Sequence, residues 1–199
     1  MRIRNITINC KKDYDKFVKK LNLYKSILFF NTYFKVNGKY YDELNYIIDA
    51  LNIKNRRKRI LYVYDSACKI IDDNNKKYRC DMCGFRNGKC YAQINTNKSN
   101  GCCRMCLYQS NSGCKTKNLT CKLFNCSEVT KRFNTLKYED LDILRLLSIK
   151  NRILIKSDYF SSKEDVLKDL YSISLTYSTI RVLYRLIKTF ILISKKNIK

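Results

Sequence analysis

Cysteines are concentrated in the middle of the chain. Nine of the eleven cysteines lie between positions 80 and 126, and the chain contains no histidine. A metal ion in this segment would therefore be held mainly by sulfur. The candidate metal ligands are Cys80, Cys83, Cys90, Cys102, Cys103, Cys106, Cys114, Cys121 and Cys126.

Two cysteine pairs have the spacing of a zinc site. One C-x-x-C pair is Cys80 and Cys83, and a second is Cys103 and Cys106, with nineteen residues between Cys83 and Cys103. Four-cysteine zinc sites commonly place about 15 to 20 residues between two such pairs. Gly84 follows the first pair and suits the tight turn of a metal knuckle, because glycine has no Cβ to clash.

The other cysteines allow a second site, and the metal itself has alternatives. The simplest second set is Cys90, Cys114, Cys121 and Cys126. Cys102 and Cys103 are adjacent, so either member of that pair could serve either site. We expect zinc, but an iron–sulfur cluster also accepts four thiolates. Redox-active thiols are a third interpretation.

The composition of the segment 76–130 also favours a metal. Four of the five glycines lie in it, among Asn, Ser and Thr residues that are typical of turns. Such a loop-rich segment cannot bury enough apolar surface to order itself. Structural zinc supplies roughly 10–16 kcal/mol in small peptides, which is enough to order it.

The chain is strongly basic. It has 41 Lys and Arg residues against 17 Asp and Glu, a formal net charge of +24. This charge favours nucleic acid, anionic lipid or an acidic protein surface as partner. A coding sequence rich in A and T would also produce it, since Lys, Asn, Ile and Tyr dominate the composition.

A basic run lies where a helix is expected to begin. It opens the predicted helix 55–72, where positive charge opposes the helix dipole by a few tenths of a kcal/mol up to ~1. This placement suggests that the run serves a partner, although a solvated helix face would look the same. The candidate nucleic-acid contacts are Arg56, Arg57, Lys58, Arg59, Arg86, Arg104, Lys115 and Lys117.

Three classes of function follow from these features. In the first, metal knuckles present the basic residues to nucleic acid, and Phe85, Tyr91, Tyr108 and Phe124 stack on unpaired bases at roughly 1–3 kcal/mol each; these aromatic residues could equally pack around the metal. The second is an iron–sulfur protein with a redox or sensing role. The third is a protein–protein adaptor or inhibitor.

An enzyme is the class with the least support. The sequence contains neither a phosphate-binding G-x-x-x-x-G-K-[ST] loop nor a G-x-G-x-x-G motif. Without histidine, the histidine-based general-base and triad mechanisms are closed.

A cytoplasmic location without a transmembrane segment is expected. The first ten residues have no apolar signal-like core, and the apolar stretch 182–194 is interrupted by Arg185 and Lys188. Clustered cysteines in a reducing compartment are typical of metal ligands before disulfides.

The fold class predicted is mainly α, with helical flanks around the cysteine-rich centre. We divide the chain into a basic, mostly helical region 1–75, a metal-binding module 76–130 and a helical region 131–199. A small β-hairpin is expected near 33–41, because Asn37-Gly38 is a strong turn signal between alternating aromatic residues.

Hydrophobic spacing places the N-terminal elements. Alternation of Ile6, Ile8 and Cys10 predicts a short strand, and Cys10 and Cys68 are expected in the core. Helices are predicted over 13–23, 42–52 (capped by Asp42) and 55–72, followed by a polar linker 72–77. Their apolar stripes are Phe17, Leu21 and Tyr24; Leu44, Ile47, Ile48 and Leu51; and Ile60, Val63, Tyr64, Ala67 and Ile71.

Helical spacing returns after the cysteines. Tyr138, Leu141, Leu144 and Leu147 predict a helix with Thr135 as its cap. Ser161 and Glu164 fit a capping box that opens one long helix from Ser162 towards Ser194. Its apolar stripe comprises Val166, Leu170, Ile173, Ile180, Leu183, Tyr184 and Ile187.

Overall fold

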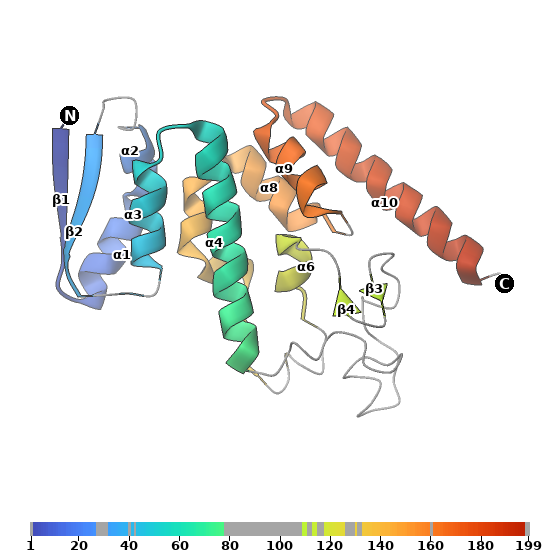
Figure 1. The fold of residues 1–199 in the computed structure, drawn as a ribbon, viewed down its shortest axis with the longest axis horizontal. Helices are drawn as coiled ribbons and strands as arrows, with labels where there is room; N and C mark the ends of the chain where they lie inside the picture. Colours follow the sequence, from blue (N-terminus) through green and yellow to red (C-terminus); the bar gives the residue numbers. More distant parts are fainter. Residues whose placement is uncertain are drawn as a thin grey trace. The chain divides into compact units, whose positions relative to one another are not determined.

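The computed structural model describes residues 2–26, 32–39, 41, 43–77, 109–110, 113–114, 118–125, 130, 133–159 and 161–197. The chain divides into two compact units, which are described separately. Unit 1 comprises Met1–Ala67 and Glu139–Arg152, and unit 2 comprises Cys68–Tyr138 and Ile153–Lys199. Most of the described residues lie in helices (Figure 1), so the mainly helical class is confirmed at this level.

Unit 1 begins with a two-stranded parallel sheet. Strand β1 (Arg2–Ile8) pairs with β2 (Thr32–Gly38) from Arg2↔Thr32 through Ile8↔Gly38. Parallel strands need a crossover connection, and helices α1 (Lys11–Lys19) and α2 (Leu21–Ser26) lie in that connection. The predicted N-terminal strand is therefore present.

The predicted hairpin at Asn37-Gly38 is wrong. Both residues belong to β2 and pair with the end of β1. Gly38 has a φ of +115°, and a Cβ at this position would lie 2.1 Å from the carbonyl oxygen of Ile8. The glycine is needed because the two backbones approach closely there, whereas the sequence signal had suggested a turn.

Aromatic and aliphatic side chains join the first two helices to the sheet. The predicted stripe is buried, and Lys20 divides it between α1 and α2. The rings of Phe17 and Tyr24 lie 5.5 Å apart, and those of Tyr24 and Phe34 lie 5.7 Å apart. Cys10, however, is exposed at the start of α1 and its thiol donates to Asp13, so the prediction that it belongs to the core is wrong.

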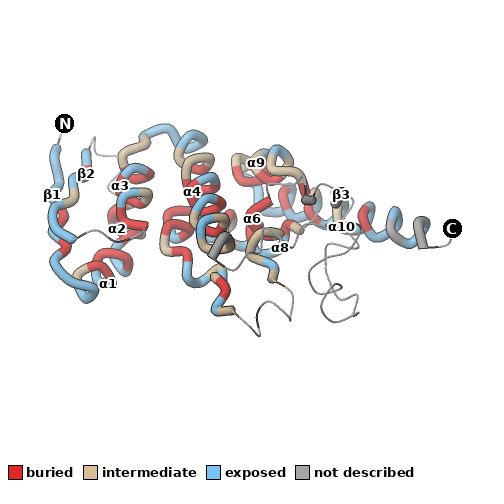
Figure 2. The backbone as a smooth tube through the Cα atoms, turned by 60° about the horizontal axis from the view of Figure 1, so that its bottom comes forward, coloured by how far each residue is buried: buried red, intermediate tan, exposed pale blue. Residues whose placement is uncertain are grey.

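Helix α3 (Leu44–Asn52) buries all four residues of its predicted stripe (Figure 2). The predicted cap Asp42 lies outside the described residues. At the other end, the side-chain amide of Asn52 accepts a hydrogen bond from the Phe34 N–H at 2.8 Å and donates to its carbonyl at 3.0 Å. This side chain fixes α3 to the backbone of β2.

Helix α4 (Arg56–Lys77) is longer than predicted. Its predicted stripe is buried, and Cys68 lies in the core as expected. The polar residues 72–77 continue the helix instead of forming a linker. Polar composition alone therefore does not distinguish the end of a helix from a loop.

The segment after Tyr138 is 3₁₀-helical instead of α-helical. It forms η4 (Tyr138–Asp140) and η5 (Asp142–Leu146), and Thr135 is buried without capping a helix. Apolar residues exactly three apart suit a helix with three residues per turn, and Leu141, Leu144 and Leu147 are all buried. The buried carboxylate of Glu43 accepts from the Ile143 N–H at 2.8 Å, which attaches η5 to the start of α3.

The described part of unit 2 contains two short strands, the end of α4 and all or part of four further helices. Strands β3 (Gln109–Ser110) and β4 (Gly113–Cys114) are antiparallel, and α6 (Leu119–Leu123) follows them. Most of α8 (Ile149–Ser157), then α9 (Lys163–Tyr171) and α10 (Leu175–Asn197), complete the unit. No helix in the described ranges is both long enough and apolar enough to cross a membrane.

The predicted long C-terminal helix is two helices. Residues 172–174 separate α9 from α10. The N-cap is Ser162, whose hydroxyl accepts from the Asp165 N–H at 3.2 Å, so the predicted capping box was placed one residue too early. Ser161 is instead fully buried beside Arg185. Val166 and Leu170 are buried, whereas the stripe residues on α10 are exposed.

Candidate functional site

The basic run begins at the start of α4. The side chain of Asn55 accepts from the Lys58 N–H at 3.0 Å, which is the geometry of a helix N-cap. The cap makes Arg56 the first helical residue and leaves the side chains of Arg56, Arg57 and Lys58 exposed to solvent. These three side chains therefore surround the N-terminal end of the helix.

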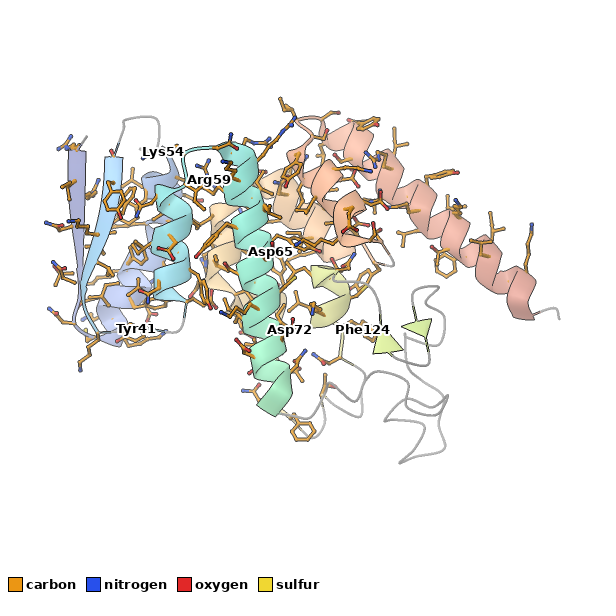
Figure 3. The ribbon with its side chains drawn as sticks, viewed as in Figure 1. Tyr41, Lys54, Arg59, Asp65, Asp72 and Phe124 are labelled. Carbon is orange, nitrogen blue, oxygen red and sulfur yellow. The ribbon has the colours of Figure 1, made fainter. Side chains whose placement is uncertain are left out.

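Arg59 and Lys54 have a structural role beside them. Arg59 is partly buried, and its guanidinium donates to the carbonyls of Ile53 at 2.8 Å and Lys54 at 3.5 Å. The ammonium of Lys54 donates to the carbonyl of Thr32. Figure 3 labels both residues near the start of α4. They tie down the connection between α3 and α4, and only part of the Arg59 fork is left for a ligand.

Two further cations complete a cluster that the sequence did not reveal. Burial lowers the pKa of Lys25, and the positive charges of Arg152 and Arg59 lower it further. Burial also lowers the pKa of Arg59, with a contribution from Arg56. We call Lys25, Arg56, Arg59 and Arg152 the basic cluster. Helices α2, α4 and α8 supply its members within unit 1.

The basic cluster lacks acidic partners for most of its members. Among the described ion pairs, none includes Lys25, Arg59 or Arg152. The Nε atom of Arg152 is buried and has no hydrogen-bond partner within the described part of the chain. Lys25 uses one donor on the carbonyl of Leu147 at 3.1 Å. Lys25, Arg59 and Arg152 thus bring positive charge together without an ion pair of their own among the described residues.

This arrangement suits an anion with several oxygens. Like charges that repel one another are stabilised when a phosphate lies between them. The N-terminus of α4 adds backbone N–H groups and the positive end of the helix dipole. Exposed Arg56, Arg57 and Lys58 can contact neighbouring phosphates of the same polymer.

The predicted metal ligands fall mostly on the undescribed part of the chain. Cys114 lies in β4 and Cys121 in α6, where it is half-buried. The others, Cys80, Cys83, Cys90, Cys102, Cys103, Cys106 and Cys126, lie outside the described residues. Within the described ranges, no group of three or more Cys, Asp or Glu residues is placed to hold a metal. The metal centre stays a prediction.

Half of the predicted nucleic-acid contacts cannot be placed either. Arg86, Arg104, Lys115 and Lys117 lie outside the described residues, as do Phe85, Tyr91 and Tyr108. Phe124 follows α6 and is 43% exposed, and its ring meets Tyr159 edge-on at 6.4 Å. Only the run at α4 and Phe124 therefore have a described geometry.

Unit 2 contains a buried ionic cluster that sequence reasoning missed. The Arg185 guanidinium lies 2.8 Å from Asp158 and 2.5 Å from Asp169, and it donates to Ser161 at 2.9 Å. Arg181 lies 3.3 Å from the second oxygen of Asp169. Both carboxylates are 1% exposed or less, so the cluster positions α10 against α9 and is not open to substrate.

No protein-family model, curated protein or solved structure matches the chain. The function must therefore be argued from its own residues.

Proposed function

We propose that the chain is a nucleic-acid-binding protein that contacts phosphates with the basic cluster and with Arg57 and Lys58. The observation that carries the proposal is the position of half-buried Lys25, whose pKa is lowered by burial and by the positive charges of Arg152 and Arg59. None of these three side chains takes part in an ion pair among the described residues. Such an arrangement disfavours the free protein and favours its complex with a polyanion.

The proposal includes zinc held by thiolates of the segment 80–126. Its support is the C-x-x-C spacing and the loop-rich composition around it. Metal binding would order the loop-rich segment that carries Arg86, Arg104, Lys115 and Lys117, and these side chains would add phosphate contacts of their own. The iron–sulfur alternative differs in an easily measured way, because it absorbs visible light.

Salt dependence tests the phosphate contacts. Each phosphate contact contributes about −0.9 to the slope of log K against log salt for double-stranded DNA and about −0.7 for single strands. We expect the triple variant Arg56→Gln/Arg57→Gln/Lys58→Gln to lose roughly two units of slope and at least tenfold in affinity. The assay is fluorescence anisotropy with labelled single- and double-stranded DNA and RNA over a salt series.

A matched variant separates the site from overall charge. Lys12, Lys16 and Lys19 are exposed on α1 of the same unit, so Lys12→Gln/Lys16→Gln/Lys19→Gln removes the same charge elsewhere. We expect it to retain most of the slope. Equal losses in the two variants would mean that the +24 charge acts diffusely, and a flat salt response of the unaltered protein would refute nucleic-acid binding.

Metal analysis of protein purified without oxygen tests the other half of the proposal. We expect stoichiometric zinc and a colourless solution. Brown protein containing iron would replace zinc by an iron–sulfur cluster, and protein containing neither metal would refute the metal centre.

A further inference from the structure

Helix α10 packs on its own unit through small and polar side chains. Ser178, Val182 and Thr189 are its buried residues in unit 2. The Ser178 hydroxyl donates to the carbonyl of Asp169 at 3.2 Å, and Arg185 joins the buried ionic cluster from the same side of the helix. Large apolar side chains normally occupy the packed face of a helix, and here they do not.

The large apolar residues of α10 lie on the opposite face. Tyr177, Ile180, Tyr184, Ile187 and Ile191 are each at least half exposed. The steps between them are three, four, three and four residues, which is the spacing of the a and d positions of a coiled coil. We call these five residues the seam. Exposed positions along α10 are pale blue in Figure 2.

The seam and its neighbours are large enough to be an interface. Leu183 and Phe190 are both 55% exposed and lie beside it. At roughly 100 Å² of exposed area each, the seven side chains present on the order of 700 Å² of mostly apolar surface. The largest patch of a typical monomer covers about 300–600 Å², whereas one partner of a standard interface buries about 800 Å².

The charges beside the seam determine which partner fits. Residues 175–197 include no Asp or Glu. Arg181, Lys188 and Lys195 lie next to the seam, at successive positions seven residues apart that correspond to e of the heptad. Arg181 pairs with Asp169, while Lys188 and Lys195 are exposed and take part in none of the ion pairs of the described residues.

A second copy of the chain is a poor match for the row of basic residues at the e positions, Arg181, Lys188 and Lys195. Two antiparallel α10 helices would bring the basic e positions of both copies together, and like charges repel. Two parallel copies would set the row against Thr176, Leu183 and Phe190, which carry no negative charge. A helix with an apolar seam and flanking carboxylates would match both the apolar seam of α10 and the basic residues beside it.

We infer that the seam of α10 is a docking surface for an acidic amphipathic helix of a partner protein. This role goes beyond nucleic-acid binding and uses a different unit from the basic cluster. The helix-in-groove and coiled-coil modes both rely on apolar anchors at this spacing, with charges that select the partner.

Synthetic helices test the inference on the full-length chain. The probe is a labelled peptide of roughly four heptads with Leu at a and d and Glu at e and g. Its controls are a twin with Lys at e and g, and an acidic peptide with Ser at a and d. We expect the first peptide to bind at least tenfold more tightly than either control in an anisotropy titration, and more weakly as salt increases.

Variants of the chain localise the binding. Ile180→Ser/Ile187→Ser should weaken binding of the acidic helix at least tenfold. The control Ile149→Ser/Ile153→Ser changes equally exposed isoleucines on α8 and should not. Lys188→Glu/Lys195→Glu should shift the binding preference of the chain from the peptide with Glu at e and g to the twin with Lys at these positions.

Four outcomes would overturn the inference. Equal binding of the acidic peptide that lacks the apolar seam would show that only charge is recognised. A dimer in sedimentation that Ile180→Ser/Ile187→Ser abolishes would assign the seam to a second copy. Binding to vesicles of phosphatidylcholine and phosphatidylserine without peptide preference would assign it to lipid. Absence of binding by the acidic peptide would show that the seam does not dock such a helix.

Discussion

The buried ionic cluster of unit 2 allows a quantitative prediction. Arg185→Met removes a guanidinium that is 15% exposed and that contacts two carboxylates of 1% side-chain exposure. Asp169 would keep Arg181 at 3.3 Å, but Asp158 would keep only the Ser161 hydroxyl. Breaking a buried ion pair from one side typically costs about 3–5 kcal/mol, so we expect a loss of this size in the free energy of unfolding.

The matched control is an ion pair on the surface. Arg145 lies 3.1 Å from Asp142, with half of its side chain exposed. Arg145→Met should cost about 0–1 kcal/mol, because solvent screens exposed pairs. Urea unfolding followed by circular dichroism gives both values, and amide hydrogen exchange should localise the loss to α9 and α10 in the first variant only.

The pH dependence of the Arg185→Met deficit provides a second measurement. Burial raises the pKa of Asp158, while Ser161 and Arg185 oppose the increase. Without Arg185 the folded pKa rises further above the unfolded value, so the folded state binds more protons. Stability is then lost as pH rises through the folded pKa and regained as pH falls. A deficit below about 1 kcal/mol, or one that does not shrink towards pH 4–5, would refute the account of paired, ionised carboxylates.

Two further predictions concern other polar side chains. Asn118 is buried, donates to the carbonyls of Asp158 at 2.7 Å and Ser161 at 3.1 Å, and caps α6 by accepting from the Cys121 N–H. Asn118→Ala should lower the free energy of unfolding by about 2–4 kcal/mol in urea titrations, because the buried carbonyls lose their donors. A loss below about 1 kcal/mol would contradict this role. The lowered pKa of Lys25 means that the unfolded state binds more protons, so stability should rise with pH from the folded pKa towards 10.5. Lys25→Met should flatten that rise in thermal melts, and it should reduce the stabilisation by inorganic phosphate relative to chloride at equal ionic strength; unchanged profiles would exclude Lys25 from the anion site.

Elements with repeated helical spacing could be predicted from the sequence. The stripes of α3 and α4 are buried as expected, because three or four apolar residues at i, i+3 and i+4 leave one face for the core. The hairpin prediction failed because the partner of β2 is β1, some thirty residues earlier, and turn chemistry contains no information on distant pairing. In 138–147 the apolar residues follow one another at a regular step of three, which is the period of a 3₁₀ helix. The prediction of an α-helix there overlooked this difference in period.

The candidate site was only partly accessible to sequence reasoning. Arg56, Arg57 and Lys58 are adjacent in the chain, so their grouping could be predicted. Lys25 and Arg152 reach the same cluster from distant positions, and only the packing of unit 1 brings them there. On α10 the spacing identified an apolar face, but amphipathicity does not say which side of a helix finds a neighbour within its own fold.

The side chain of Asn52 has a consequence for solubility. Because its amide occupies both the N–H and the C=O of Phe34, that stretch of β2 offers fewer groups with which a foreign strand could pair. On β1, the exposed Arg2 and Arg4 would repel the same strand of another molecule. Both features hinder the β1–β2 sheet from recruiting strands of other molecules into an aggregate.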